Sequence, residues 1–153
     1  MARSPAAGVV LVSVGVFAVS LVLPAFSYVT EGDRYQAFTG IVALGLGVLP
    51  AFTALFSLPS GDLSFLPMLA WFANPMLLAA WVATGMNWRR GALGFGLASL
   101  ALGLGFAFAR HLQMQEGTTK NVWLGAGYYT WIAAMVVAVG LAWLMDADVT
   151  TGE

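Results

Sequence analysis

The side chain best suited to chemistry in this sequence is its one histidine, His111. Arg110 precedes it and Glu116 lies five positions on, so the three residues supply a base, an acid and a cation. Residues five apart do not share a helix face, however, and acid–base catalysis needs two positioned groups. We therefore interpret His111 as a solvated side chain at a membrane edge. The alternatives are an axial ligand to a haem or chlorophyll-like pigment, and an enzyme at the membrane surface.

The sequence contains no motif for binding a metal ion or a nucleotide. Cysteine is absent, which excludes disulfides, Cys-bound zinc and iron–sulfur clusters, and one histidine does not complete a zinc site. Glu31 and Asp33 share a turn with Arg34, but a calcium site needs six or more oxygens. No glycine-rich phosphate loop or hydrolase signature occurs. We expect no metal and, unless His111 holds a pigment or haem, no cofactor.

Two prolines inside apolar stretches mark a second kind of candidate site. Pro75 cannot donate to the carbonyl of Trp71, and Pro50 leaves that of Leu46 free. In lipid a freed carbonyl needs a partner, which Asn74 can provide, and transporters build central sites from such breaks. Coupled transport generally uses an intramembrane carboxylate or histidine, so we favour simple kinks. The alternative is a midplane site for an uncharged or lipophilic molecule, formed by Asn74, Pro75, Pro50 and Thr53.

Rows of small residues predict close helix packing. One row in residues 91–109 is Gly94, Ala98, Ala101 and Gly105, and a second row on another face is Ala92, Gly96, Ser99 and Gly103. Small residues let helix backbones approach closely, which drives association in lipid. Two such faces place this helix at the centre of a bundle or at a seam with another protein. Residues 38–58 carry a similar row, Gly40, Ala43, Gly47, Ala51 and Ala54, and the first stretch carries Ser13, Ser20 and Ser27 at heptad spacing.

The elements that position these residues follow from composition. Of 153 residues, 60% are hydrophobic and 8% charged, which is far from the balance of a soluble domain. Five apolar stretches are long enough to span a membrane: about residues 7–28, 38–58, 65–86, 91–109 and 122–145. None contains a charged residue or histidine. The sequence therefore predicts an all-α, single-domain bundle of five transmembrane helices.

The segments between these stretches are short, which favours an up-down arrangement. Residues 110–116 could extend the fourth helix, and Thr118 or Thr119 could cap the fifth. We expect the first stretch to be a retained helix rather than a cleaved leader, because it is long enough to span. Five spans would place the termini on opposite sides. The basic residues then tie three to three, and Arg3 with the acidic C-terminal segment favours an N-terminus inside.

Residues 71–78 and the segment from Gly127 to Trp131 give the chain a resemblance to small uncharacterised multi-pass bacterial membrane proteins. The resemblance implies a bacterial inner (plasma) membrane and no particular activity. With a net charge of −1, the chain has no basic surface for nucleic acid. We predict a non-enzymatic accessory or scaffolding subunit that contacts the lipid bilayer and other membrane subunits or copies of itself. A transporter or channel-like protein and a pigment-binding or haem-binding subunit remain alternatives.

Overall fold

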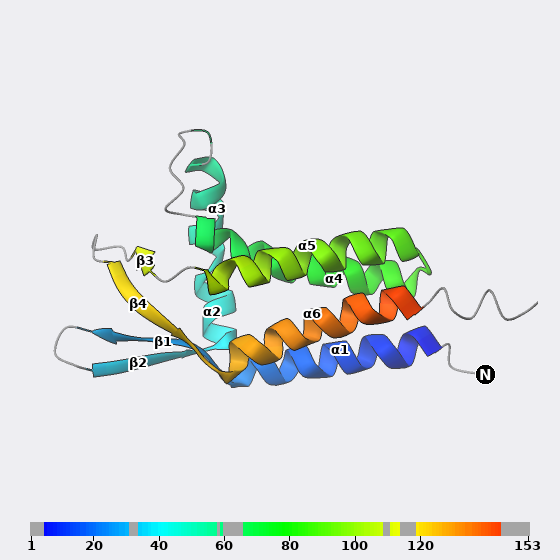
Figure 1. Ribbon diagram of the computed structural model, residues 1–153, viewed down its shortest axis with the longest axis horizontal. Coiled ribbons are helices and arrows are strands. Elements are labelled where there is room, and N and C mark those ends of the chain that lie inside the picture. The colour runs from blue at the N-terminus through cyan, green and yellow to red at the C-terminus, as the bar shows by residue number, and fades with distance from the viewer. Residues whose placement is uncertain are drawn as a thin grey trace, which may run out of the picture.

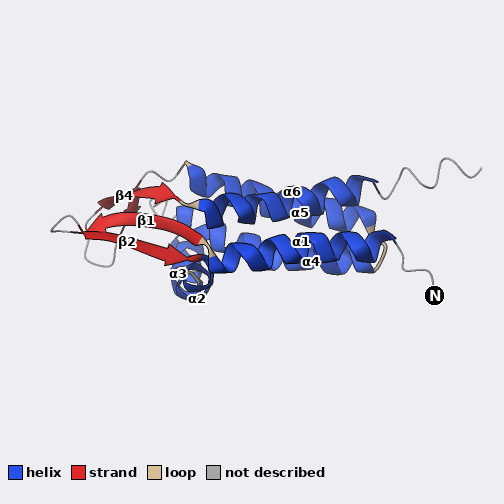
Figure 2. Ribbon diagram, turned by 90° about the horizontal axis from the view of Figure 1, so that it is seen from below, coloured by secondary structure: helices blue, strands red, loops and turns tan. Residues whose placement is uncertain are grey.

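The computed structural model describes residues 5–30, 34–57, 59, 66–108, 111–113 and 119–144. The long helices are α1 (Pro5–Val22), α4 (Ala73–Gly85), α5 (Arg89–Ala107) and α6 (Ala126–Leu144), and the shorter ones are α2 (Gly40–Leu46), α3 (Val48–Ser57) and the 3-10 helix η2 (Leu66–Phe72). The strands are β1 (Pro24–Thr30), β2 (Arg34–Thr39), β3 (His111–Gln113) and β4 (Thr119–Leu124). The long helices form a bundle with the strands at one end, and α2 and α3 run across the bundle axis (Figures 1 and 2).

The bundle has the composition and length of a membrane-spanning domain. Within the described residues, Pro67–Gly85, α5 and α6 are each long and apolar enough to cross a bilayer, and the bent α2–α3 pair would be a fourth such segment if it counted as one span. The described apolar part of α1, Val10–Val22, is shorter. The chain is therefore a mostly helical membrane-associated protein with three or four segments that could cross a bilayer, and the five predicted spans are not confirmed.

Small side chains fill the bundle interior while large apolar ones point outward. In the bundle α1 lies against α6, α4 lies against α5, and α5 also lies against α6. Ala73, Leu77, Met135 and Ala138 form its buried centre, with Phe17 and Trp131 among the half-buried residues around them. Outward-facing leucines and valines are exposed, which suits an environment of lipid.

An antiparallel four-stranded sheet, in the order β2-β1-β4-β3, continues the bundle at one end. The β1–β2 hairpin follows α1, and β4 leads into α6, so Ser27 of β1 pairs with Trp123 of β4. Aromatic rings connect the sheet to the helices: Phe26 lies 5.3 Å from Phe38 and 6.2 Å from Phe106 between ring centroids. The sheet is therefore packed on the end of the bundle.

Glycines make the turns between bundle and sheet possible. A Cβ on Gly40, at the start of α2, would overlap the carbonyl oxygen of Ser20 in α1. A Cβ on Gly125, between β4 and α6, would overlap the carbonyl oxygen of Pro24. Backbones touch at both places, which only glycine permits.

The all-α prediction is wrong at this end of the molecule. The first helix ends at Val22 because Pro24 cannot continue it, and residues 24–28 belong to β1. The last helix begins at Ala126, after residues 119–124 in β4, so Thr119 is not its cap. Residues 111–113 form β3 rather than an extension of the fourth helix, and Thr118 lies outside the described residues. Phe26 and Tyr28 in β1, and residues 122–124 in β4, made the ends of these segments apolar enough to resemble spans.

The second predicted span, residues 38–58, is also different. Its helix breaks at Gly47 into α2 and α3, which meet at a bend of 46°. Pro50 explains the break, since its ring displaces the carbonyl of Leu46, the last residue of α2. Because α2 and α3 cross the bundle axis, α1 begins and α6 ends at the same end of the bundle (Figure 1).

Candidate functional site

Asn74 occupies the junction between η2 and α4, where Pro75 interrupts the helical hydrogen bonds. Its Nδ2 donates to the carbonyl of Trp71 at 2.9 Å, which is the carbonyl that Pro75 cannot serve. Its Oδ1 accepts from the indole Nε1 of Trp131 in α6 at 3.0 Å. The Trp71 indole in turn donates to the carbonyl of Leu44 in α2 at 2.7 Å. Asn74 thus stabilises its own kink and joins α4 to α6.

The other residues of the predicted midplane site lie on a different element. Pro50 and Thr53 belong to α3, which crosses the bundle axis, while Asn74 and Pro75 lie in α4 (Figure 1). The Thr53 hydroxyl donates to the carbonyl of Leu49 in its own helix at 3.1 Å, and its side chain is exposed. No hydrogen bond within the described part of the chain connects Thr53 with Asn74.

A second polar contact joins three helices at the middle of α1 and α6. Ser13 of α1 is buried, and its hydroxyl donates to the carbonyl of Ala134 in α6 at 2.7 Å. The same oxygen accepts from Trp81 Nε1 of α4 at 2.9 Å. The crevice beside this contact, lined by Val10, Ser13, Trp81, Thr84, Ala138 and Leu141, is too narrow for a water molecule. Ser13 and Ser20 are both buried in α1, where Ser20 donates to the carbonyl of Phe17, but Ser27 lies in β1, so the three heptad serines do not form one stripe.

One of the two small-residue faces of α5 is packed inside the bundle. Ser99 is buried and donates to the carbonyl of Ala73 in α4 at 2.8 Å. A Cβ on Gly96 would come within 2.9 Å of Val139 in α6, and one on Gly103 within 2.9 Å of Ile132. The row Ala92, Gly96, Ser99 and Gly103 is buried throughout, so it brings α4 and α6 against α5.

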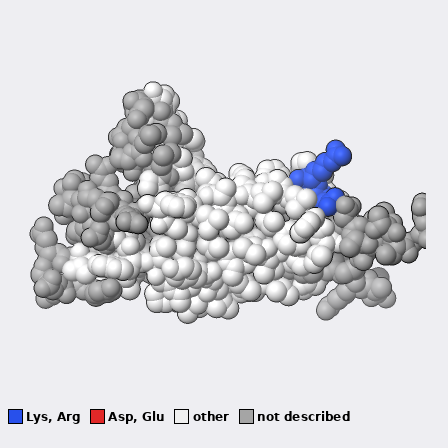
Figure 3. Space-filling model, viewed as in Figure 1, with Lys and Arg blue, Asp and Glu red and all other residues white. Residues whose placement is uncertain are grey.

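The other small-residue face of α5 is open. Gly94, Ala101 and Gly105 are exposed and Ala98 is half-buried, and a Cβ on Gly94 or Gly105 would meet nothing within 4 Å. The exposed side chains of Leu97 and Leu104 lie between these small residues. We call the surface formed by Gly94, Leu97, Ala101, Leu104 and Gly105 the outer face of α5. The surface of the bundle around it carries no charged side chain until Arg89 and Arg90 at its end (Figure 3).

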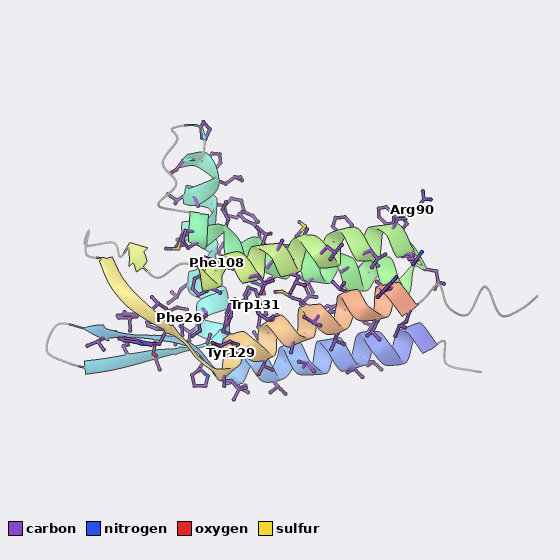
Figure 4. The ribbon with its side chains drawn as sticks, in the orientation of Figure 1. Phe26, Arg90, Phe108, Tyr129 and Trp131 are labelled. Atoms are coloured by element: carbon purple, nitrogen blue, oxygen red, sulfur yellow. The ribbon has the colours of Figure 1, made fainter. Side chains whose placement is uncertain are left out.

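His111 lies in β3, opposite Asn121 of β4. Its side chain lies outside the described part of the structure, as do Arg110 and Glu116. No group of three or more potential metal-ligating side chains occurs among the described residues. Phe26, Phe108, Tyr129 and Trp131 gather at the sheet end of the bundle, while Arg90 lies at the opposite end (Figure 4).

Sequence reasoning missed the hydrogen bonds that the aromatic residues make across the bundle. Trp81 and Trp131 donate to side chains on other helices, and the hydroxyl of Tyr128 donates to the carbonyl of Gly103 at 2.9 Å. The signal was the presence of polar-tipped aromatic residues deep inside apolar stretches, where each N–H or O–H needs a partner.

Comparison with known proteins adds no relative to this description. No protein-family model matches the chain, and no curated protein or solved structure is significantly similar to it.

Proposed function

We propose that this protein is a non-enzymatic subunit of a larger assembly in a bacterial inner membrane, and that it docks through the outer face of α5. The partner is another membrane polypeptide or a second copy of the chain. The observation that carries this proposal is the contrast between the two small-residue faces of one helix. One face brings α4 and α6 against α5, and on the other a Cβ at Gly94 or Gly105 would meet nothing within 4 Å among the described residues.

Physical reasoning supports docking at this face rather than ordinary contact with lipid. Lipid tails fill gaps between large side chains, whereas a row of small residues lets a second helix come close enough for backbone contact. Gly94, Ala98, Ala101 and Gly105 extend over eleven positions, or about 16 Å along the helix axis. Gly94 and Gly105 are exposed, and a Cβ on either would meet nothing within 4 Å, so the row is free for such an approach.

The buried polar side chains that a midplane transport site would use are occupied by hydrogen bonds within the described residues. Both polar atoms of the Asn74 side chain are hydrogen-bonded within the chain, and the Ser13 hydroxyl both donates and accepts. These contacts hold helices together. They favour a structural role over transport through a site at Asn74.

The test compares two glycines with equally open surroundings. Gly105→Leu blocks the outer face of α5, and Gly15→Leu on α1 is its matched control, because a Cβ on either glycine meets nothing within 4 Å. Each full-length variant is extracted gently from its native membrane and analysed by native mass spectrometry. We expect the wild-type chain and Gly15→Leu to travel with partner polypeptides or copies in fixed ratio, and Gly105→Leu to run alone. A wild-type chain that runs alone would overturn the proposal.

A further inference from the structure

The α2–α3 pair is the largest element that the bundle does not enclose. It runs across the bundle axis at the sheet end and anchors there through the bond from Trp71 Nε1 to Leu44 and through backbone donation from Gly40 to Leu23 at 3.0 Å (Figure 1). Beyond Gly47, α3 contacts η2. Residues 38–57 contain no charged side chain, and the apolar side chains of Leu49 and Phe56 are 78% and 79% exposed.

The position of the pair along the bundle corresponds to a membrane boundary. With 19 residues, α5 is about 28 Å long, which matches the hydrocarbon thickness of about 30 Å. The bundle therefore fills the hydrocarbon layer by itself. An element lying across the end of that bundle, next to the sheet, lies where hydrocarbon gives way to water. With 10 residues, α3 is about 15 Å long and cannot cross the layer alone.

The two sides of α3 differ in polarity. Ala51 and Ala54 are buried and mark the side that packs against the rest of the chain. At about 100° per residue, Phe52 and Leu55 fall on one flank of that contact, and Thr53 and Ser57 fall on the opposite flank. Both hydroxyls bond carbonyls of their own helix, Thr53 to Leu49 and Ser57 to Thr53, and Phe52 and Leu55 are exposed. An apolar flank and a polar flank on one helix suit a boundary between lipid and water.

We propose that α2 and α3 lie in the plane of the membrane at this boundary and bind the acyl chains of the bilayer through the flank formed by Phe52 and Leu55. The ring of Phe52 packs edge-on against Phe72, which lies in the segment Pro67–Gly85, with 5.6 Å between ring centroids, so the apolar flank adjoins a membrane-spanning segment. The polar flank, with Thr53 and Ser57, faces water on the sheet side. The pair is then a membrane-surface element, and the spans are α1, whose 18 residues make it about 27 Å long, together with Pro67–Gly85, α5 and α6. This inference does not depend on the docking face of α5.

Depth-dependent quenching tests the proposal, and the absence of cysteine makes single-cysteine variants straightforward. Four variants of the full chain are made: Phe52→Cys, Ser57→Cys, Val136→Cys and Ala37→Cys. Each is labelled with a small fluorophore and reconstituted in phosphatidylcholine vesicles. The acyl chains of the lipid carry bromines either near the headgroup or near the chain ends. Val136 is exposed in the middle of α6 and is the deep control, and Ala37 is exposed in β2 and is the water control.

We expect the label at position 52 to lose more fluorescence with shallow bromines, and the label at position 136 to lose more with deep ones. Before labelling, Ser57→Cys reacts with a membrane-impermeant maleimide as readily as Ala37→Cys does, from the same side. Deep quenching at position 52, equal to that at position 136, means a spanning segment and overturns the proposal. A label at position 52 that neither lipid quenches lies in water, like the label at position 37, or against another polypeptide, and either result also overturns the proposal.

Discussion

Single polar side chains decide how the helices of this bundle are paired. No water reaches the interior of a lipid-embedded bundle, so each indole N–H or hydroxyl there must find a partner in the protein. Trp131 donates a hydrogen bond to Asn74, and Trp81 donates one to Ser13, in each case on another helix. These contacts fix which helix faces which, because the apolar packing around them consists mostly of alanine, leucine and methionine and specifies little.

The bond between Trp131 and Asn74 is measurable by a double-mutant cycle. Trp131→Phe removes the donor and Asn74→Leu removes the acceptor, and we expect a coupling free energy of about 1 kcal/mol, typical of hydrogen bonds between membrane helices. Reversible unfolding in mixed micelles gives the free energy of unfolding of each variant. Thr53→Val combined with Asn74→Leu is the control, because these residues share no partner. Additive effects of Trp131→Phe and Asn74→Leu would contradict the bond.

The sequence predicted one half of the Asn74 contact and not the other. The rule that Pro75 frees the carbonyl of Trp71 is local, and it identified Asn74 as a donor three residues away, where the bond is found. The bond from Trp131 joins positions 57 residues apart. It depends on α6 lying beside α4, which no local pattern encodes, so the sequence could only predict that both side chains need partners.

At the scale of the elements, lengths and periodicity predicted the membrane helices well and the sheet not at all. The predicted span 91–109 differs from α5 by two residues at each end. The strand β1 escaped prediction because Phe26 and Tyr28 stack their rings on Phe38 of β2, and Phe26 also contacts Phe106 of the bundle, so β1 is as apolar as a helix end. Pro24 marks the end of α1, but a proline in a long apolar run is equally typical of a kinked membrane helix.

The turn from sheet into α2 depends on Gly40, and a matched pair of glycines in one helix tests this. Gly40→Ala forces a Cβ onto the backbone of Ser20, which cannot give way, so we expect the protein to lose about 1–3 kcal/mol of stability. Gly45→Ala in the same helix meets open space, and helix propensity favours it by up to about 1 kcal/mol. We expect the midpoint temperature of thermal unfolding in detergent to be lower for Gly40→Ala than for the wild-type chain. For Gly45→Ala we expect it to be unchanged or higher. Equal midpoints would mean that α2 does not meet α1 there.

At the scale of the whole molecule, the in-plane position of α2–α3 changes how the charges are distributed between the two ends. The start of α1, the turn before Arg89 and the end of α6 share one end of the bundle, and the strand that begins with Arg34 lies at the other (Figures 1 and 2). The prediction of five spans placed Arg34 on the same side of the membrane as Arg89 and Arg90. The sequence could not reveal the regrouping, because an apolar segment of 20 residues has the same composition whether it crosses the bilayer or lies along its surface.

The arrangement makes a topological prediction that separates the two cases. If α2–α3 does not cross the membrane, both termini lie on the side of Arg90 and opposite the sheet. We expect tags placed before Met1 and after Glu153 to be accessible from the same side of oriented membrane vesicles as Arg90→Cys, and Ala37→Cys to react with an impermeant maleimide only from the other side. Arg90 and Ala37 are both exposed, so burial does not limit either reaction. A C-terminal tag on the opposite side from the N-terminal one would require an odd number of spans, and it would return α2–α3 to the hydrocarbon interior.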